Sequence, residues 1–406
     1  AEHLIRLRSG GGRGDDQLEP YHDRIREAVR AALTPAQLAS HHRHLAEAME
    51  AAEGVAPDRL AYHFDGAAIP EKAALYAERA GDQAQQALAF DHAVQMYRLT
   101  LAQRTLTEAR RRRIEQRLGD ALAALGRGIE AATAYQAAAR GEHGEDALRL
   151  RRLAAEQLLR NGKLAQGTEL LRSVLAEVGV PLPRSAARSI LGTALVRARI
   201  LLRGMHHTER PTEALDPALR RRQECLWAAT YCLYGYRPLL ALELHARFLL
   251  LSLELGEPGR LAQALGFEAL MRMILTPGRP DIYSRLLAQA EQLAERSQQP
   301  YIQALVALLA IGVAQMSGDW PLAIQRSEKT LSILRERCSG VTWEVHLCQT
   351  WRLTNQLMIG ELALVEKSLP ELIGALHERG DTYQLSMIKS VIKPLPLEKF
   401  VEETTR

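Results

Sequence analysis

The 406-residue chain is poor in several residue types, and each scarcity excludes a class of protein. Aromatic residues make up only 5% of it, and β-branched residues are also scarce, which argues against a β-rich fold. Its four cysteines form no CxxC pair, so a disulfide scaffold is excluded and reduced thiols are expected. The N-terminus lacks the apolar core of a signal peptide. The longest uncharged run, Tyr301 to Gly318, contains two glutamines and is better explained by a buried helix than by a membrane span.

The chain also lacks an excess of either charge. Its 52 basic and 48 acidic residues give a net charge of +4, which does not call for a polyanionic partner. Arginine dominates over lysine, but no arginine-rich stretch alternates with base-stacking aromatic residues. We therefore interpret the runs Arg110–Arg113 and Arg220–Arg222 as solvated helix faces, and a nucleic-acid partner is disfavoured.

What the chain does contain is a repeating helical pattern. From about Ala36 onward, apolar residues recur at i, i+3, i+4 and i+7 in segments of roughly 15–20 residues, separated by short turns with Gly or Pro. Many turns share one frame, in which a Gly is followed five residues later by a small or apolar residue. The predicted repeat positions are Gly81, Ala93, Tyr97, Gly119, Gly126, Ala131, Tyr135, Ala138, Gly162, Gly167, Leu171, Gly278, Gly318, Ala323 and Gly360.

This frame has a physical basis in helix pairing. A tight turn between antiparallel helices needs a residue that tolerates a positive φ, which Gly does at low cost, and small residues allow the helix axes to approach. One pair cannot bury both of its faces, so pairs must stack into a superhelix with a concave face. The sequence therefore predicts an all-α fold, an α-solenoid of antiparallel helix pairs. The first copies resemble tetratricopeptide repeats, whereas the longer later copies fit a general α-solenoid equally well.

The first residues differ from the rest. His3–Arg8 and Leu18–His22 are expected to be strands around a glycine-rich tip, Ser9–Asp16, and Asp23–Ala32 a short helix. This order is typical of the end of a winged-helix domain. Because the chain opens at Ala1 and not at Met, we expect it to be part of a larger protein and to have a truncated or divergent tail. The predicted segments are 1–34 (winged-helix end), 35–180 (repeats), 181–217 (long helix and loop), 218–380 (degenerate repeats) and 381–406 (tail).

Motifs of catalysis and cofactor binding are missing from the sequence. The glycine-rich tip is not followed by Lys-Ser or Lys-Thr, and no GxSxG or HExxH occurs. His41 and His44 share a helix face that His63 could approach, but no Cys or carboxylate completes a metal site, so polar packing is the better interpretation. We therefore predict no catalytic, cofactor-binding or metal-binding residues, and the chain is not expected to be an enzyme.

Several short segments together resemble a known family. They are similar to the junction in bacterial STAND signalling ATPases, where an AAA-type module and its winged helix lead into a tetratricopeptide sensor arm. Later segments resemble the subgroup in which a serine/threonine kinase domain comes first. The segments are Tyr21–Val29, His44–Ala46, Leu60–Phe64, Lys72–Ala73, Leu88–Phe90 and Ala93–Val94, then Leu175–Pro183, Arg197–Arg199, Leu202–Gly204, Ala246–Arg247 and Gly256–Arg260.

This resemblance implies a function for the chain. It would be the cytoplasmic sensor or scaffold arm of a bacterial signal-transduction ATPase, and it would bind a protein, a peptide or a small inducer on its concave face. Ligand binding would change the curvature of the superhelix and so act on the kinase and ATPase domains of the parent protein. Two alternatives stay open: a DNA-linked regulator that uses the winged-helix remnant, and an independent enzyme.

Overall fold

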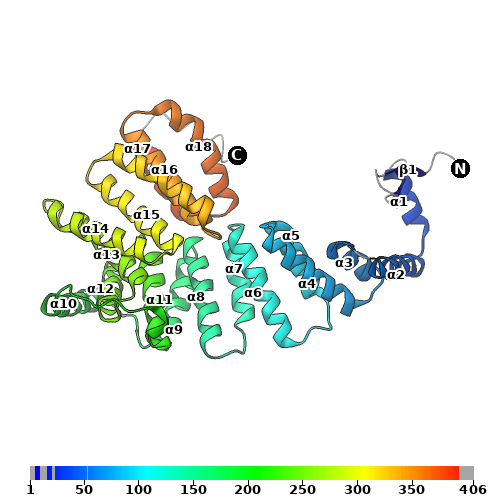
Figure 1. Cartoon of the computed structure of the whole chain (residues 1–406), viewed down its shortest axis with the longest axis horizontal. Helices are drawn as coiled ribbons and strands as arrows, with labels where there is room; N and C mark the ends of the chain where they lie inside the picture. The colour runs from blue at the N-terminus through cyan, green and yellow to red at the C-terminus, as the bar shows by residue number, and fades with distance from the viewer. Residues whose placement is uncertain (1–4, 10–15, 21–22, 53, 184, 393–406) are drawn as a thin grey trace. The chain divides into compact units, whose positions relative to one another are not determined.

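The computed structural model describes residues 5–9, 16–20, 23–52, 54–183 and 185–392. These residues are almost entirely helical, which confirms the predicted all-α solenoid (Figure 1). The chain divides into two compact units, Ala1–Leu118 and Gly119–Arg406, and each is described by itself. The division falls inside the segment 35–180 that the sequence grouped together.

The first unit opens with a two-stranded antiparallel hairpin in which Leu7 lies opposite Leu18. The helix after the strands coincides with the predicted one, whereas both strands are shifted from their predicted bounds, so that Ser9 and Asp16, the ends of the predicted tip Ser9–Asp16, are paired with each other. Residues 3–4, 10–15 and 21–22 of the predicted elements lie outside the described residues. The elements are β1 (Ile5–Ser9), β2 (Asp16–Pro20), α1 (Asp23–Ala32), α2 (Pro35–Ala51), α3 (Pro57–Gly66), α4 (Pro70–Gln86), α5 (Phe90–Ala102) and α6 (Glu108–Ala124), the last of which continues into the second unit.

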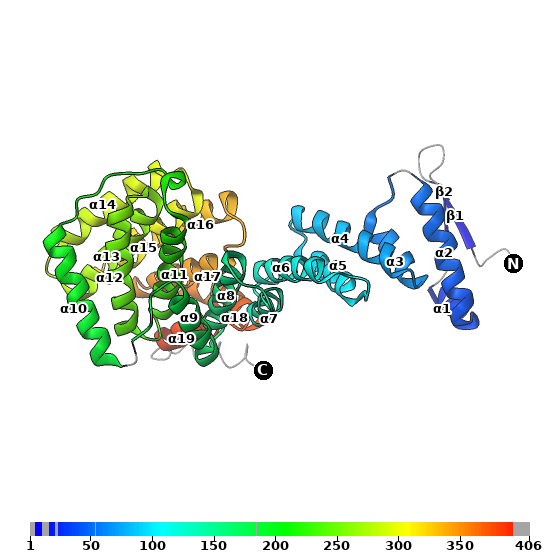
Figure 2. The ribbon, with the colours of Figure 1, turned by 90° about the horizontal axis from the view of Figure 1, so that it is seen from below.

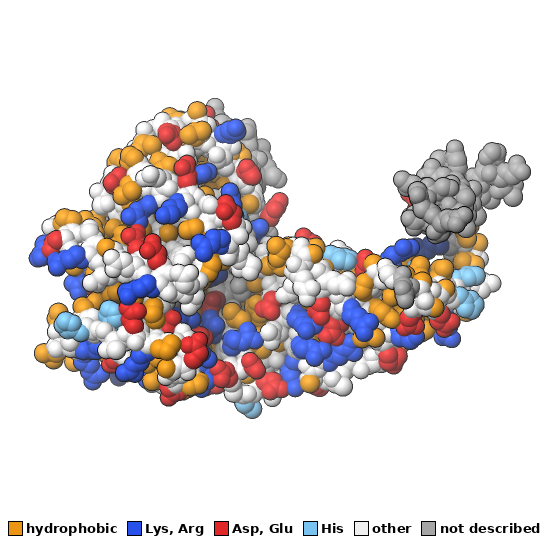
Figure 3. All heavy atoms as spheres, viewed as in Figure 1, with side chains coloured by type: hydrophobic (Ala, Val, Ile, Leu, Met, Phe, Trp, Pro, Cys, Tyr) orange, Lys and Arg blue, Asp and Glu red, His pale blue; other side chains and the backbone are white. Residues whose placement is uncertain are grey.

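Small side chains let the helices of the first unit pack closely, α3 on α4 and α4 on α5. Gly81 of α4 faces Tyr97 of α5, and a Cβ at position 81 would lie 2.6 Å from the Tyr97 ring. The Tyr97 hydroxyl donates to Asp82 Oδ1 at 2.9 Å, so the ring is held in place. The basic run is not free here, because Arg110 and Arg113 both pair with the buried Glu78 carboxylate; Figure 3 shows basic and acidic side chains gathered over α4 and α6.

The second unit consists of stacked helix pairs, α8/α9, α11/α12, α13/α14, α15/α16 and α17/α18. The first helices of successive pairs also contact one another: α13 contacts α15, α15 contacts α17, and α17 contacts α19. These helices therefore form a common inner layer (Figures 1 and 2). The elements are α7 (Gly128–Ala138), α8 (Glu145–Arg160), α9 (Leu164–Glu177), α10 (Ala186–Arg203), the 3-10 helix η1 (Thr212–Ala214), α11 (Pro217–Leu233), α12 (Pro238–Leu255), α13 (Pro258–Leu275), α14 (Pro280–Arg296), α15 (Pro300–Met316), α16 (Trp320–Arg337), α17 (Thr342–Met358), α18 (Leu362–Glu378) and α19 (Thr382–Ile392).

The predicted repeat positions fall at turns and at helix crossings. Gly119 lies against the Tyr135 ring and Gly167 against Leu159, at crossings within the second unit. The small or apolar markers are buried: Ala93, Ala131, Ala138, Leu171 and Ala323. Four turn glycines, Gly126, Gly162, Gly318 and Gly360, have positive φ.

Not every turn follows the predicted glycine rule. Gly278 lies in a turn but does not have a positive φ. Positive φ also occurs at Ala68, Leu88 and Gln298, where the sequence has no Gly. Ala68 and Leu88 each come five residues before a buried Ala, as the frame requires, so the turn geometry continues where the glycine is replaced.

Helix α10 fills the long interval in the repeat spacing and is apolar on two sides. Val196 and Ile200 are buried on the side where α10 packs against α12, whereas Leu195 and Leu202 are 59% and 90% exposed. Figures 1 and 2 both show α10 lying alongside α12. Within the described part of the chain, no helix combines the length and the apolar character needed to cross a membrane.

Candidate functional site

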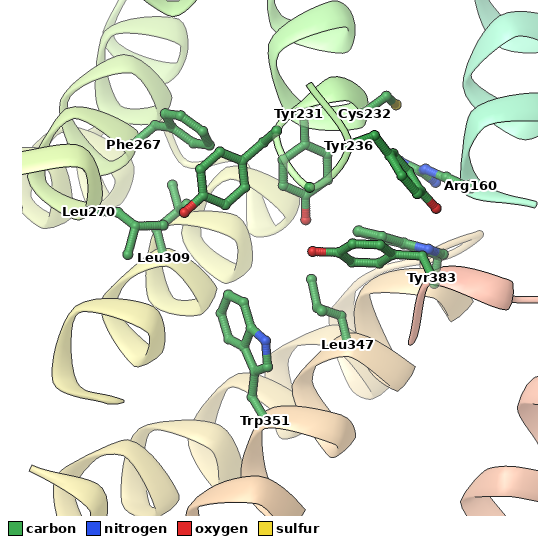
Figure 4. Close-up of a pocket in the computed structure, with 13 residues that line it drawn as sticks. Arg160, Tyr231, Cys232, Tyr236, Phe267, Leu270, Leu309, Leu347, Trp351 and Tyr383 are labelled. Atoms are coloured by element: carbon green, nitrogen blue, oxygen red, sulfur yellow. The ribbon is translucent and has the colours of Figure 1, made fainter. Parts of the chain in front are cut away.

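A cavity lined by aromatic side chains, the aromatic chamber, lies in the inner layer of the second unit (Figure 4). It encloses about 610 Å³, part of which is open to solvent. Its walls come from α8, the end of α11 and the turn after it, α13, α15, α17 and α19. The aromatic residues that line it are Tyr231, Tyr234, Tyr236, Phe267, Trp343, Trp351 and Tyr383.

The end of α11 connects the walls of the aromatic chamber. The Tyr231 ring meets the edge of Trp343 of α17 at a centroid distance of 5.4 Å, and the Tyr236 ring lies 5.2 Å from that of Tyr383 of α19. Such edge-on and tilted pairs are favourable arrangements of aromatic quadrupoles. In Figure 4 the hydroxyls of Tyr231 and Tyr383 both point toward the centre of the cavity. Residues more than a hundred positions apart in the sequence thus face one space.

Three glycine turns make room for the segment that runs from Arg379, after α18, into the first turn of α19 beside the chambers. A Cβ on any of these glycines would collide with a side chain of that segment, because the backbones approach so closely. Two of them, Gly126 and Gly162, are predicted repeat positions. They therefore both form the predicted turns and leave room for the side chains of this segment. Gly126, Gly162 and Gly235 lie against Arg379, Thr382 and Tyr383, respectively.

Arg160 of α8 separates the aromatic chamber from a second, more polar cavity. Its guanidinium lies 4.8 Å from the centre of the Trp343 ring, and its Nη2 lies 3.3 Å from Glu344 Oε1. Burial lowers the pKa of Arg160, but the nearby Glu344 carboxylate raises it by a larger amount. The net pKa therefore lies above its ordinary value, and the side chain remains cationic. Because Arg160 and Trp343 line both cavities, the two cavities adjoin.

The second cavity, the polar chamber, has about 440 Å³ of space between its walls, part of which is open to solvent. Burial raises the pKa of Asp381 to about 6, and burial together with Arg379 lowers the pKa of His346 to about 4. At neutral pH, Asp381 is therefore mostly ionised and His346 is neutral. Burial also lowers the pKa of Arg379, whose guanidinium forms no ion pair within 4 Å among the described residues.

Buried polar atoms without partners concentrate around these two cavities. Ten buried side-chain nitrogen or oxygen atoms lack a hydrogen-bond partner among the described residues, and five of them line the two chambers. Each such atom costs about 1–3 kcal/mol if it stays unpaired. The five are Arg160 Nε, Tyr231 OH, Tyr236 OH, Trp343 Nε1 and Arg379 Nη1.

The cysteine that lines the aromatic chamber is not an activated nucleophile. Burial raises the pKa of the Cys232 thiol, which lines the aromatic chamber, to about 12. A thiol with this pKa stays protonated near neutral pH and is a poor nucleophile. The same holds for Cys225, seven residues earlier in α11, which is also buried. The arrangement is suited to binding a molecule by contact and hydrogen bonds.

The predicted histidine group is arranged differently from its expected form. His63 Nδ1 lies 3.2 Å from Nδ1 of His42, whereas His41 and His44 are exposed on α2. Among the residues that the structure describes, no group of three His, Cys, Asp or Glu side chains is placed to hold a metal ion. Burial lowers the pKa of both His42 and His63, as is expected for a packed, neutral pair.

Sequence reasoning did not find the chambers. Of the predicted positions, only Gly126 lines one of them, the polar chamber. A compositional signal was nevertheless present, because three of the eleven tyrosines fall within the six residues Tyr231–Tyr236 of a chain that is only 5% aromatic.

Comparison with known proteins adds no family to this description. No protein-family model matches the chain, and no curated protein matches it.

Proposed function

We propose that the second unit is the ligand-binding part of a signal-transduction protein and that its ligand is a small organic molecule held in the aromatic chamber. The observation that carries this proposal is the set of four unpartnered polar atoms around a cavity with aromatic walls, with a fifth in the adjoining polar chamber. Ligand pockets of this kind are mostly apolar, with a few polar groups that fix the orientation of the ligand.

The cost of leaving buried polar groups unpaired supports this proposal. Unpaired donors in a buried cavity destabilise the fold, so a protein that keeps several of them close together is stabilised by a molecule that pairs them. In the first unit, by contrast, the buried Glu78 carboxylate accepts hydrogen bonds from three arginines. The second unit differs in holding polar groups that the protein itself does not satisfy.

The aromatic chamber lies between helix pairs, so ligand binding there can change how the pairs are arranged. The chamber walls come from α8, α11, α17 and α19, which belong to different helix pairs. A ligand that touches all of them favours one mutual arrangement of these pairs, and it shifts the equilibrium by its differential affinity for that arrangement. This is the mechanism expected of a tetratricopeptide-like sensor arm in a bacterial STAND ATPase or kinase–ATPase, with catalysis in other domains of the parent protein.

The DNA-linked alternative gains no support from three arginines of the two basic runs. Arg110 and Arg113 pair with Glu78, and Arg221 pairs with Glu145. Arginines neutralised by carboxylates are poorly placed to contact phosphates, which depends on cationic groups that release counterions.

Binding of a small-molecule library to the purified chain tests the proposal. Compounds that raise the unfolding temperature should lose affinity for Trp351→Leu, which removes an aromatic wall of the chamber. They should keep their affinity for Trp320→Leu, because Trp320 is similarly half-buried on α16 and lies outside the chamber. Equal affinity for both variants, or no binder in a library of several thousand compounds, would contradict a ligand chamber.

A further inference from the structure

The unpartnered atoms where the two chambers meet are all hydrogen-bond donors. Arg160 Nε, Trp343 Nε1 and Arg379 Nη1 each carry an N–H and cannot accept. Arg160 and Trp343 line both chambers, and Arg379 lines the polar chamber. A group that pairs with all three must therefore be rich in acceptor oxygens.

Two of these donors are cationic, and the charge near them limits the charge of the partner. Arg160 is already compensated by Glu344 at 3.3 Å, whereas Arg379 has no carboxylate within ion-pair distance among the described residues. Asp381 also lines the polar chamber, so a second negative charge on the ligand would be repelled. The carboxylates of Glu378 and Asp381 also act on Arg379 and raise its pKa, so its charge is partly offset and the site fits at most one further negative charge.

The rest of the ligand is determined by the aromatic chamber. Its wall combines aromatic rings with the aliphatic side chains of Leu270, Leu309 and Leu347, and two fully buried tyrosine hydroxyls there lack a partner among the described residues. An apolar body, aromatic or branched aliphatic, matches this lining, since small-ligand sites are mostly apolar with a few placed polar groups.

We propose that the ligand is a small apolar carboxylic acid, bound with its body in the aromatic chamber and its carboxylate between Arg160, Trp343 and Arg379. This rests on the proposed function and adds the chemical class of the ligand. Arg379 supplies a guanidinium that forms no ion pair among the described residues, and Gly126 makes room for it, because a Cβ at residue 126 would lie 2.7 Å from Cδ of Arg379.

Matched acids and amides test the proposal by calorimetric titration of the full chain. The probes are indole-3-acetate with indole-3-acetamide, and 4-methylpentanoate with 4-methylpentanamide, since each amide keeps the shape of its acid without the charge. At least one acid should bind about tenfold or more tightly than its amide, as charge-assisted hydrogen bonds in a desolvated site imply.

Variants at position 379 separate charge from shape. Arg379→Gln should bring the acid-to-amide affinity ratio close to one, Arg379→Lys should keep most of it, and Arg285→Gln, at an exposed arginine of α14, should leave it unchanged. Unfolding temperatures of all variants show that they are folded.

Each other outcome has a definite meaning. Equal binding of acid and amide by the wild-type chain would overturn the anion site while leaving the ligand chamber in place. A ratio that Arg379→Gln does not change would overturn the role of Arg379. If none of the four probes bound, the proposed carboxylic acid would be rejected, and the library experiment above would decide separately about the chamber.

Discussion

The two units share one packing device and differ in how they treat buried polar groups. In the first unit, Gly81 admits the ring of Tyr97, and in the second, Gly119 admits that of Tyr135 in the same way. Each tyrosine hydroxyl donates to the aspartate that follows the glycine, Asp82 or Asp120, at 2.9 Å. Among the described residues, however, every buried side-chain nitrogen or oxygen without a partner belongs to the second unit.

This difference distinguishes repeats that only support their neighbours from repeats that are arranged to bind a ligand. A repeat that only supports its neighbours gains stability by satisfying each buried polar group, as the first unit does with Glu78. A repeat that binds a ligand must keep some groups available, and it does so at a cost to its own stability. The second unit therefore combines a large leucine-rich core with local unsatisfied donors.

The largest effect is expected from removing the most satisfied carboxylate of the first unit. Glu78 accepts from Arg110 Nε at 2.7 Å and from Arg113 Nη2 at 2.8 Å, and it also meets Arg117. Glu78→Ala leaves three cations facing one another and should lower the free energy of unfolding by about 3 kcal/mol. Hydrogen exchange should locate the loss in α4 and α6, and the exposed Glu71→Ala should show none.

The next effect has the opposite sign and lies in the second unit. Burial raises the pKa of Asp381 to about 6 from an ordinary 3.8, so unfolding releases a proton between those pH values. The contribution of Asp381 to stability is therefore present at low pH and is lost as the pH rises through this window. Asp381→Asn should raise the free energy of unfolding at pH 7 by about 2 kcal/mol and change little near pH 3.5, because Asn also caps a helix well.

The other ionisable groups of the two chambers also affect how the free energy of unfolding depends on pH. Arg160, Arg379 and His346 line the polar chamber with Asp381, and the Tyr236 and Tyr383 rings lie nearby. The pKa of His346 is lowered to about 4, so its contribution is lost as the pH falls from 6.5 to 4, opposite in sign to that of Asp381. In urea unfolding, Asp381→Asn should lose more stability than the wild type on acidification from pH 6 to 4, because only the wild type gains the contribution of Asp381. Parallel curves would contradict the raised pKa.

A smaller effect should be equal in the two units. Gly81→Ala and Gly119→Ala each place a Cβ within 2.7 Å of a buried tyrosine ring, an overpacking that costs about 2 kcal/mol, while helix propensity returns about 1 kcal/mol. A net loss near 1 kcal/mol is expected from both. Gly374→Ala, in a helix with open space around the site, should instead stabilise by up to about 1 kcal/mol, measured by the same thermal unfolding.

These glycines show how far the sequence predicts the structure. The pairing frame predicts the all-α fold, the crossings at Gly119 and Gly167, and the turns at Gly126 and Gly162, because each depends on residues close in sequence. Turns at Ala68 and Leu88 are not predicted, since tertiary packing there holds non-glycine residues at positive φ. The chambers are not predicted either, because Arg160, Trp343 and Tyr383 come together only when the inner layer stacks, and each alone is indistinguishable from a core residue.

The smallest effect separates a satisfied tyrosine from an unsatisfied one. Tyr135 OH donates to Asp120 Oδ1, so Tyr135→Phe should cost about 1 kcal/mol of unfolding free energy. Tyr231 OH is buried without a partner, so Tyr231→Phe removes a desolvated hydroxyl and should leave stability within about 0.5 kcal/mol of the wild type, or raise it. The two substitutions delete the same atom, and chemical denaturation at one pH compares them directly. A loss at Tyr231 as large as that at Tyr135 would mean that its hydroxyl is already paired in the free protein, and the chamber would then keep one donor fewer for its ligand.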